Sequence, residues 1–439
     1  MSSVLIRKCR VVTPYGVFKT DIYVSDGKID ALGDGLKERG AEVIDAEGMY
    51  VFPGFVDEHV HFREPGMEFK EDFETGTLAA AAGGVTTVLE MPNTVPPVAD
   101  VKELRRKASL LKDKAYVDFG LYGVLTDESL DNIEEMLEAG AIGFKAFLGP
   151  TTGDISPPSD GTVLEALQKS RMKGFILAFH CENRQLVHYF EQKAWKQKLS
   201  PLTHLESRPA ICEVDSVRKI TYYAEKTGGK ALLLHLSSGE TVDYLSSSHL
   251  ENVIAETCPH YLFFDSRDYE KLGPLIKVNP PIRTDVDRKK LWNALRQGIV
   301  SNIGSDHAPH TLQEKERGMP EAPSGMVGVE TVGPLMVNAA LNGYVSLERA
   351  CEALSANPAK TFNIYPRKGA IMPGSDADFV IIDPREKSRI AASKLHSKQK
   401  FTPFDGYELS MKIRYTILRG EVIAADGEPT GKKIGKQIP

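Results

Sequence analysis

Residues 51–66 read VFPGFVDEHVHFREPG, a short apolar run that follows a Pro-Gly turn and ends in two histidines and an arginine. In a β-strand, residues two apart project from the same face, so His59, His61 and Arg63 are expected on one side. Two neutral imidazoles favour a zinc-type metal, and a guanidinium beside them can bind a carboxylate through two parallel hydrogen bonds. Paired histidines also occur on ordinary polar strand faces. The rest of the chain therefore has to show whether His59 and His61 are metal ligands or simply polar residues.

Seven further apolar runs follow this one, with helix-compatible segments between them. The eight runs are residues 54–60, 85–91, 117–123, 141–147, 174–180, 231–237, 252–258 and 301–307. The segments between them are rich in Ala, Leu, Lys and Glu, and several end in Gly, which commonly terminates a helix. Eight strand-helix units over roughly 300 residues predict a (β/α)8 (TIM) barrel. A doubly wound open sheet is the alternative, but no GxGxxG sequence follows a run to support it.

The two ends of the chain have a different character. Residues 1–52 and 366–439 contain short apolar segments separated by turn residues such as Asp26-Gly27, a pattern typical of β-structure. Chain termini often lie close together. We therefore predict that both ends form one small β-sandwich domain beside a barrel domain of residues 53–365.

The composition is that of a soluble globular protein, and the formal net charge is −6. This charge argues against nucleic acid or an anionic membrane as the main partner, since both favour a basic face. No apolar run approaches the roughly 20 residues of a membrane span, and the N-terminus lacks the features of a signal peptide. The five cysteines are scattered and form no CxxC pair. Together these features predict a cytoplasmic protein with reduced, mostly buried thiols.

Polar residues stand at the ends of five of the apolar runs, where the reacting groups of such barrels gather. They are His59, His61, Lys145, His180, His235 and Asp306. Individually, the histidines could be hydrogen-bonded core residues and the aspartate a helix cap. A lysine inside an apolar strand is harder to explain, because a buried ammonium must pair or react. Jointly, the six residues predict a metal site.

A lysine in a metal site suggests carboxylation, because an ammonium offers no lone pair to a cation. A lysine that has added CO2 carries two anionic oxygens and can bridge two metals, which then hold a hydroxide at neutral pH. We predict two Zn²⁺ per chain, bridged by carboxylated Lys145 and a hydroxide. The other ligands are expected to divide, with His59, His61 and Asp306 at one ion and His180 and His235 at the other. Asp306 is the expected catalytic proton acceptor, which suits hydrolysis of an amide-like bond.

The whole chain resembles the amidohydrolase superfamily, and within it the dihydroorotases that are grouped with allantoinases and hydantoinases. The stretches that carry the resemblance are PGFVDEHVHFREPG, AAAAGGVTTVLEMPNT, GFKAF, FHCEN, HLSS, ETCPHYL, VNPPIR, IGSDHAPH, GMVGVET and PGSDADFVIID. The resemblance implies a metal-binding barrel with a β-sandwich built from both chain ends. It places the ligands of the family on the same six residues.

Four further positions resemble dihydroorotases more than allantoinases. They are Arg63 after HVHF, Asn93 in MPNT, Asn279 in VNPPIR and His310 in SDHAPH. The resemblance implies that Arg63, Asn93 and His310 bind an exocyclic carboxylate and that Asn279 meets a ring amide. It also implies that Ser324 and Gly325 offer backbone groups to the substrate. Plainer readings are a surface ion pair for Arg63, turns for the two asparagines and an exposed loop for His310.

The activity implied by the resemblance is reversible hydrolysis of (S)-dihydroorotate to N-carbamoyl-L-aspartate, run as ring closure in pyrimidine (UMP) synthesis. An allantoinase or a hydantoinase of the dihydropyrimidinase type is the alternative. An inactive scaffold partner of a carbamoyltransferase is a remote one, since all six ligands are present. A homo-oligomer and an association with aspartate carbamoyltransferase both stay open.

The sequence departs from its relatives in two places. Many bacterial dihydroorotases of this type lack the lysine and use an aspartate shortly after it, whereas here Lys145 is present and Asp154 follows nearby. The stretch EAPSGMVG has Ser324 where relatives often carry an aromatic residue. Residues 147–161 and 311–326 are polar or rich in Gly and Pro, which predicts two long loops over the barrel mouth. The second is a candidate lid.

Overall fold

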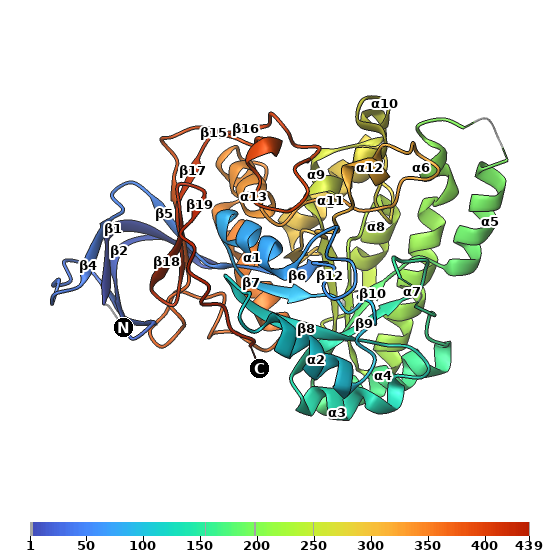
Figure 1. Cartoon of the computed structure of the whole chain (residues 1–439), viewed down its shortest axis with the longest axis horizontal. Helices are drawn as coiled ribbons and strands as arrows, with labels where there is room; N and C mark the ends of the chain where they lie inside the picture. The colour runs from blue at the N-terminus through green and yellow to red at the C-terminus, as the bar shows by residue number, and fades with distance from the viewer. Residues whose placement is uncertain (1–2, 154, 197–198, 249, 439) are drawn as a thin grey trace.

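The computed structural model describes residues 3–153, 155–196, 199–248 and 250–438. Within these ranges the chain forms a parallel barrel and, beside it, a sheet built from both chain ends (Figure 1). The blue N-terminal strands and the red C-terminal strands lie together at one end of the molecule, and the helices surround the barrel at the other (Figure 1).

The barrel strands coincide with the eight apolar runs of the sequence. Across the described residues they are β6 (Phe55–Val60), β7 (Val85–Glu90), β8 (Asp118–Val124), β9 (Ala141–Phe147), β10 (Ile176–His180), β11 (Lys230–Leu233), β12 (Val253–Thr257) and β13 (Asn302–Ile303). Consecutive strands pair in parallel. The ring closes where Val60 bridges His307 and the His61 amide donates to the His307 carbonyl at 2.8 Å. The predicted (β/α)8 barrel is confirmed.

Local sequence signals begin and end the helices around the barrel. The α-helices of the described part are α1 (Phe73–Ala82), α2 (Val101–Leu111), α3 (Ile133–Glu138), α4 (Asp160–Lys173), α5 (Arg184–Ala194), α6 (Thr203–Ser207), α7 (Ala210–Thr227), α8 (Gly239–Ser248), α9 (Pro259–Phe263), α10 (Tyr269–Leu272), α11 (Asp285–Gln297), α12 (Leu312–Lys315), α13 (Val332–Leu341), α14 (Leu347–Cys351) and α15 (Asn357–Thr361). Asp72 caps α1 by accepting from the Thr75 amide at 2.8 Å. Gly174, Gly228 and Gly298 end α4, α7 and α11 with φ of 81°, 70° and 79°, a left-handed conformation that favours glycine.

The two chain ends combine into one mixed sheet. Its strands within the described ranges are β1 (Val4–Thr13), β2 (Gly16–Ser25), β3 (Lys28–Gly33), β4 (Glu42–Asp45), β5 (Tyr50–Pro53), β14 (Phe379–Asp383), β17 (Lys412–Leu418), β18 (Glu421–Ala425) and β19 (Glu428–Pro429). The antiparallel pair β5–β14 joins the halves, and the sheet has its own core, which includes Ile6, Val51 and Ile381. A separate pair, β15 (Ser388–Arg389) and β16 (Glu408–Leu409), lies outside this sheet. The exact division at 52/53 and 365/366 stays a prediction.

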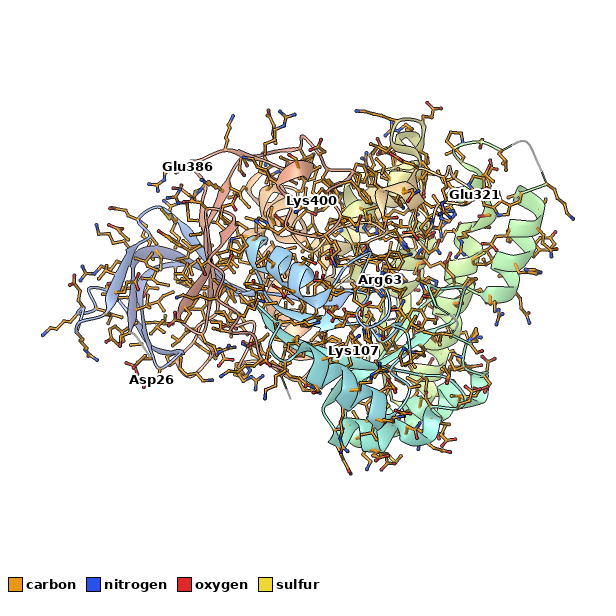
Figure 2. All side chains as sticks on the ribbon, in the orientation of Figure 1. Asp26, Arg63, Lys107, Glu321, Glu386 and Lys400 are labelled. Carbon is orange, nitrogen blue, oxygen red and sulfur yellow. The ribbon has the colours of Figure 1, made fainter. Side chains whose placement is uncertain are left out.

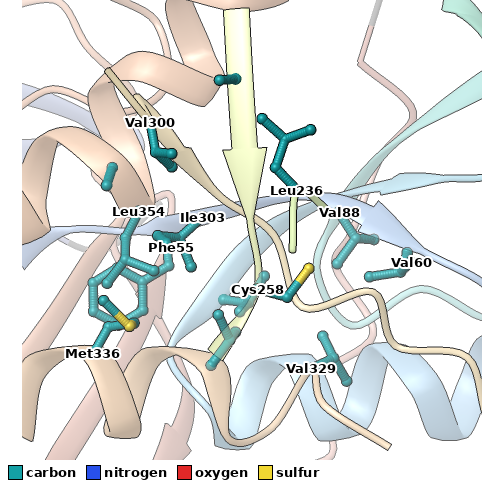
Figure 3. Close-up of a cluster of buried hydrophobic side chains, with 14 of the residues drawn as sticks. Phe55, Val60, Val88, Leu236, Cys258, Val300, Ile303, Val329, Met336 and Leu354 are labelled. Carbon is teal, nitrogen blue, oxygen red and sulfur yellow. The ribbon is translucent and has the colours of Figure 1, made fainter. Parts of the chain in front are cut away.

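Apolar packing between the barrel and its helices positions the strand ends. Figure 3 shows part of this core, with Phe55 and Val60 of β6, Ile303 of β13 and Met336 of α13 among the labelled side chains. All five cysteines are buried and unpaired, as the sequence predicts. Among the described helices, none has the length and hydropathy that crossing a bilayer requires.

A buried ion-pair network connects the barrel to the terminal sheet. The Lys368 ammonium lies 2.5 Å from Asp118, 2.7 Å from Asp378 and 3.0 Å from Asp376. Three clustered carboxylates can resemble a metal site. Here the lysine already supplies the positive charge, so we interpret the cluster as a structural contact.

Candidate metal centre and substrate pocket

A small cavity lies at the carboxyl ends of the barrel strands. The predicted site residues that line it are His59, His61, Arg63, Asn93, Lys145, His180, His235, Asn279, Asp306, Ser324 and Gly325. His310 lies behind them, in contact with Arg63. Figure 2 shows Arg63 within the barrel, away from the terminal sheet that carries Asp26. The fold thus brings together residues that lie up to 266 positions apart, from 59 to 325.

Two histidines and an aspartate converge on one point of this cavity. The Asp306 Oδ1 atom lies 3.3 Å from His59 Nε2 and 3.4 Å from His61 Nε2. Each Nδ1 faces an oxygen: Glu256 Oε1 at 2.9 Å for His59, and Asn93 Oδ1 at 2.6 Å for His61. Because the ring protons are held there, both Nε2 atoms present lone pairs to the carboxylate. Three converging acceptors with no hydrogen between them fit a bound cation.

The ionisation of these residues also suits a metal. Burial lowers the pKa of His59 to about 3 and that of His61 to about 4, so both imidazoles are neutral at pH 7. Burial opposes the charge on Asp306, but His59 and His61 attract the carboxylate once they protonate in acid, and this holds its pKa well below the usual range, so Asp306 is ionised at pH 7. Asp306 is no helix cap, because α12, the next helix, begins after Thr311, which caps it.

A second group of donors lies beside the first. His180 Nε2 faces Glu182 Oε2 at 3.1 Å, so its Nδ1 presents a lone pair to His235 Nε2, 2.9 Å away. The buried Lys145 Nζ and His235 Nδ1 have no hydrogen-bond partner among the described residues. Burial lowers the pKa of Lys145 to about 8, and its Nζ lies 5.1 Å from the Phe147 ring centre. These unsatisfied groups fit a carboxylated lysine that shares metal ions with the two histidines.

Arg63 is a buried cation with no ion-pair partner within 4 Å among the described residues. It is 2% exposed, and the carboxylates that stabilise its charge, among them Glu90 and Asp306, act on it without a direct ion pair. Its Nε donates to the Pro309 carbonyl at 3.3 Å. Burial lowers its pKa to about 10, which leaves it charged at pH 7. The reading of Arg63 as a surface ion pair is therefore wrong, and its open hydrogen-bonding positions face the cavity.

The other predicted substrate residues occupy neighbouring parts of the cavity wall. Asn279 Oδ1 is buried without a partner in the described structure, so it can accept from a ligand. The Asn93 oxygen is used by His61, and its amide nitrogen lies 3.3 Å from the Thr152 carbonyl in loop 147–161. Asp154, in the same loop, lies outside the described residues.

Comparison with known proteins agrees with this geometry. The model of the amidohydrolase family matches residues 50–423. The chain belongs to the amidohydrolase family. It is 34% identical to the L-hydantoinase of Paenarthrobacter aurescens over 98% of this chain and 96% of that one. It is 36% identical to the dihydroorotase of Methanosarcina acetivorans (96% and 92% covered) and 34% identical to the allantoinase of Deinococcus radiodurans (99% and 98%).

A solved structure extends the likeness to three dimensions. The L-hydantoinase (dihydropyrimidinase) from Arthrobacter aurescens superposes with a TM-score of 0.96 at 33% identity, over 99% of both chains. These relatives support a hydrolase activity for this amidohydrolase. Because these relatives are named for three different substrates, the comparison does not identify the substrate of this chain. The substrate has to be inferred from the residues of the pocket.

Sequence reasoning missed the carboxylates that orient the histidines of this amidohydrolase. Glu182 accepts from His180 and lies 2.5 Å from Arg208 Nη1. Burial opposes its ionisation, but Arg208 and His180 together lower the pKa of Glu182 to about 2. Glu256 Oε1 faces His59 Nδ1 at 2.9 Å, but burial raises the pKa of Glu256 well above its usual range, so this acceptor is a neutral carboxyl group. The FHCEN stretch was the available signal for Glu182, whereas Glu256 is 197 residues from its partner.

Replacing Glu182 with Gln is expected to weaken metal binding by about 10- to 100-fold, because His180 loses the negatively charged acceptor that orients its ring and raises its basicity. Competition of the purified protein with a coloured zinc chelator would measure this. Glu191→Gln is the matched control, since Glu191 also pairs with Arg208 but forms no hydrogen bond or ion pair with His180 in the described structure. Equal affinities in both variants would contradict the orienting role.

Two buried lysines hold loop 311–326 in place. The Lys277 ammonium donates to the carbonyls of Met319 and Ala322, each at 2.6 Å. The Lys315 ammonium donates to the Gly325 carbonyl at 2.8 Å. Burial lowers the pKa of Lys277 to about 8 and that of Lys315 to about 7. The sequence predicts this loop over the mouth but not its internal anchors.

The substitution Lys315→Met is expected to lower the free energy of unfolding by roughly 1–3 kcal/mol, because buried carbonyls lose their donor. Urea unfolding followed by circular dichroism would measure it. Arg317→Met changes an exposed residue of the same loop and serves as the control. If the two variants unfold at the same urea concentration, Lys315 does not anchor the loop.

Proposed function

We propose that this amidohydrolase is a dihydroorotase. It would catalyse the reversible hydrolysis of the cyclic amide of (S)-dihydroorotate to N-carbamoyl-L-aspartate, with ring closure for pyrimidine synthesis as the cellular direction. The observation that carries the proposal is the buried Arg63 guanidinium in the cavity wall, which has no direct ion-pair partner among the described residues. Dihydroorotate has an exocyclic carboxylate that would pair with it, whereas allantoin and simple hydantoins have none.

The energetics of the pocket favour an anionic ligand. A buried charge without a partner is costly, and a substrate carboxylate relieves that cost on binding. Arg63 Nη2 lies 3.4 Å from His310 Nε2, so His310 stands directly behind the guanidinium. Asn93 lines the same cavity, and its amide nitrogen has a second hydrogen besides the one directed at the Thr152 carbonyl. This group would grip a carboxylate, and Asn279 would accept from a ring N–H.

The donor set described above fits two divalent cations, for which we propose zinc. The residues that would hold them are His59, His61, His180, His235, Asp306 and Lys145 as its carbamate. When bound, such cations lower the pKa of a water molecule and polarise the ring carbonyl.

Asp306 is the residue that we assign to proton transfer. It is ionised at neutral pH and lies in the cavity wall, so it can accept a proton from the attacking water. It then delivers this proton to the ring nitrogen as the carbon–nitrogen bond breaks. In the ring-closing direction it removes the proton from that nitrogen. Arg63 and Asn279 hold the ring in register with Asp306, which lowers the entropic part of the barrier.

The test of this function is the ultraviolet absorbance of dihydroorotate, followed with purified protein supplied with zinc and bicarbonate. We expect rapid loss of absorbance that a chelator abolishes. Hydantoin, allantoin and dihydrouracil are assayed in parallel under the same conditions. Faster cleavage of any of these neutral rings than of dihydroorotate would overturn the proposal.

Carboxylation of Lys145 makes reactivation dependent on pH. Only a neutral amine adds CO2, and the folded Lys145 has a pKa of about 8, so the reactive form increases as the pH rises through 8. At equal concentrations of dissolved CO2, metal-stripped protein given zinc and bicarbonate should therefore regain activity faster at pH 8.5 than at pH 6.5. The bicarbonate-free sample at each pH is the control. Equal recovery with and without bicarbonate would argue against a carbamate.

A further inference from the structure

A second buried cation lies behind the carboxylate corner of the pocket. Lys70 is 8% exposed, and its Nζ lies 2.9 Å from His310 Nδ1 and 2.9 Å from Glu314 Oε1. Glu314 in turn accepts from the Thr311 amide and hydroxyl, each at 2.9 Å. The ammonium therefore connects the segment before α1 to the start of α12. It does not line the cavity itself.

The contact with Lys70 decides which nitrogen of His310 carries the proton. An ammonium is only a donor, so Nδ1 must accept. The proton then lies on Nε2, where the Ser324 carbonyl accepts it at 3.1 Å. Arg63 Nη2, at 3.4 Å, is a longer contact that leaves its hydrogens for another acceptor. Burial and the charges of Arg63 and Lys70 hold the pKa of His310 well below its usual range, so the ring is neutral.

We infer that Lys70 is a positioning and specificity-determining residue: it holds His310 as an Nε2–H donor beside Arg63 and adds positive charge behind the carboxylate corner. This inference rests on the proposed dihydroorotase function and deepens it. A ring with an exocyclic carboxylate gains from the charge of Lys70 and from the Arg63 hydrogens that the fixed His310 tautomer leaves free. A neutral ring of the same shape gains only from the shape of the pocket.

A merely structural role for Lys70 gives a different expectation. Its bond to Glu314 could simply hold two loops together, and breaking it would then affect all substrates equally. Lys398 provides the matched control, because it donates to the Glu68 carbonyl at 2.6 Å and pairs with Asp72. It thus supports the same segment as Lys70 but forms no hydrogen bond or ion pair with His310 in the described structure. Lys398→Met reports the effect of loosening that segment alone.

The experiment compares metal-loaded Lys70→Met, Lys70→Gln and Lys398→Met proteins with the wild type. Gln can still donate to His310 Nδ1 but lacks the charge, so it separates the two contributions. The kinetic probes are dihydroorotate and its carboxamide, a neutral isostere. Calorimetric binding of orotate, which carries the same carboxylate, needs no turnover. The tautomer of His310 is read from the imidazole ¹⁵N shifts, assigned with His310→Asn.

We expect Lys70→Met to raise the KM for dihydroorotate by roughly 10- to 100-fold, the range for losing a hydrogen bond to a charged group. Its kcat should change much less, and orotate binding should weaken in parallel. The KM for the carboxamide should rise by about threefold or less. Lys70→Gln should retain the His310 tautomer. Its KM for dihydroorotate should rise, but by less than in Lys70→Met. Lys398→Met should leave the ratio of the KM values for the two substrates unchanged.

Two results would overturn the role of Lys70 alone. The first is a KM that rises equally for dihydroorotate and for the carboxamide in Lys70→Met. The second is a Lys70→Met protein in which both the His310 tautomer and the affinity for orotate are unchanged. Both presuppose a wild-type protein that hydrolyses dihydroorotate. A metal-loaded wild type that cleaves a neutral ring but not dihydroorotate would instead overturn the proposed function, and the specificity of Lys70 with it.

Discussion

Replacing Asp306 with Asn is expected to lower kcat for dihydroorotate by about 100- to 10,000-fold, the range for losing a positioned acid–base group. The carboxylate lies between His59 Nε2 and His61 Nε2 and is ionised at neutral pH, so it is the available proton acceptor. An amide in its place cannot take the proton of the attacking water. Steady-state kinetics with dihydroorotate, together with metal analysis of the same sample, would measure the effect.

The metal analysis separates the two roles of Asp306. A fall in kcat with both metals retained identifies proton transfer, whereas loss of one metal identifies ligation. Asp57→Asn is the control, because Asp57 is a buried neighbour that accepts from the Ser305 amide at 3.0 Å but does not line the cavity. If a fully metallated Asp306→Asn protein has a kcat within tenfold of the wild-type value, another group carries out the proton transfer.

The barrel and the residues at its mouth were predictable because strand burial leaves a strong signal in the sequence. A parallel strand covered on both faces is apolar along its length, so a polar residue at its carboxyl end stands out. His180 at the end of β10 and Lys145 inside β9 are examples. Lys145 was especially informative, since a buried lysine has few structural explanations.

The partners of these residues were not predictable, because they come from distant parts of the chain. His59 and Glu256 are 197 positions apart, and Lys70 and His310 are 240 positions apart. No periodicity connects such pairs, and each glutamate or lysine reads in the sequence as an ordinary surface charge. The lysines that anchor loop 311–326 were missed for the same reason. The packing of loops at the barrel mouth, which brings these groups together, has no local sequence signal.

The terminal domain illustrates the same limit. Its β character and the joining of both chain ends followed from turn residues and short apolar segments. The strand order did not, because β1 pairs in parallel with both β4 and β5 while it pairs antiparallel with β2. Such pairings depend on which edges meet after collapse, and short strands of similar composition do not distinguish them.

Replacing Arg63 with Gln is expected to weaken transition-state binding of dihydroorotate by roughly 2–5 kcal/mol, the range for truncating one partner of a buried charge pair. This corresponds to a fall in kcat/KM of about 30- to 4,000-fold. For the carboxamide of dihydroorotate, kcat/KM should fall by less than about tenfold, because a neutral group forms only an ordinary hydrogen bond with the guanidinium. The ratio of the two kcat/KM values isolates the contribution of charge from that of packing.

Arg283→Gln is the matched control for this substitution. Arg283 is also buried near the barrel mouth and donates from Nε to the Ser237 hydroxyl at 2.9 Å, but it does not line the cavity. Its loss should lower stability and leave the substrate ratio unchanged. If Arg63→Gln reduces both substrates equally, the guanidinium holds the pocket together without selecting the carboxylate. Dihydroorotate would then have no advantage over a neutral ring, because its selection depends on Arg63 being a charge that the protein leaves for its ligand to neutralise.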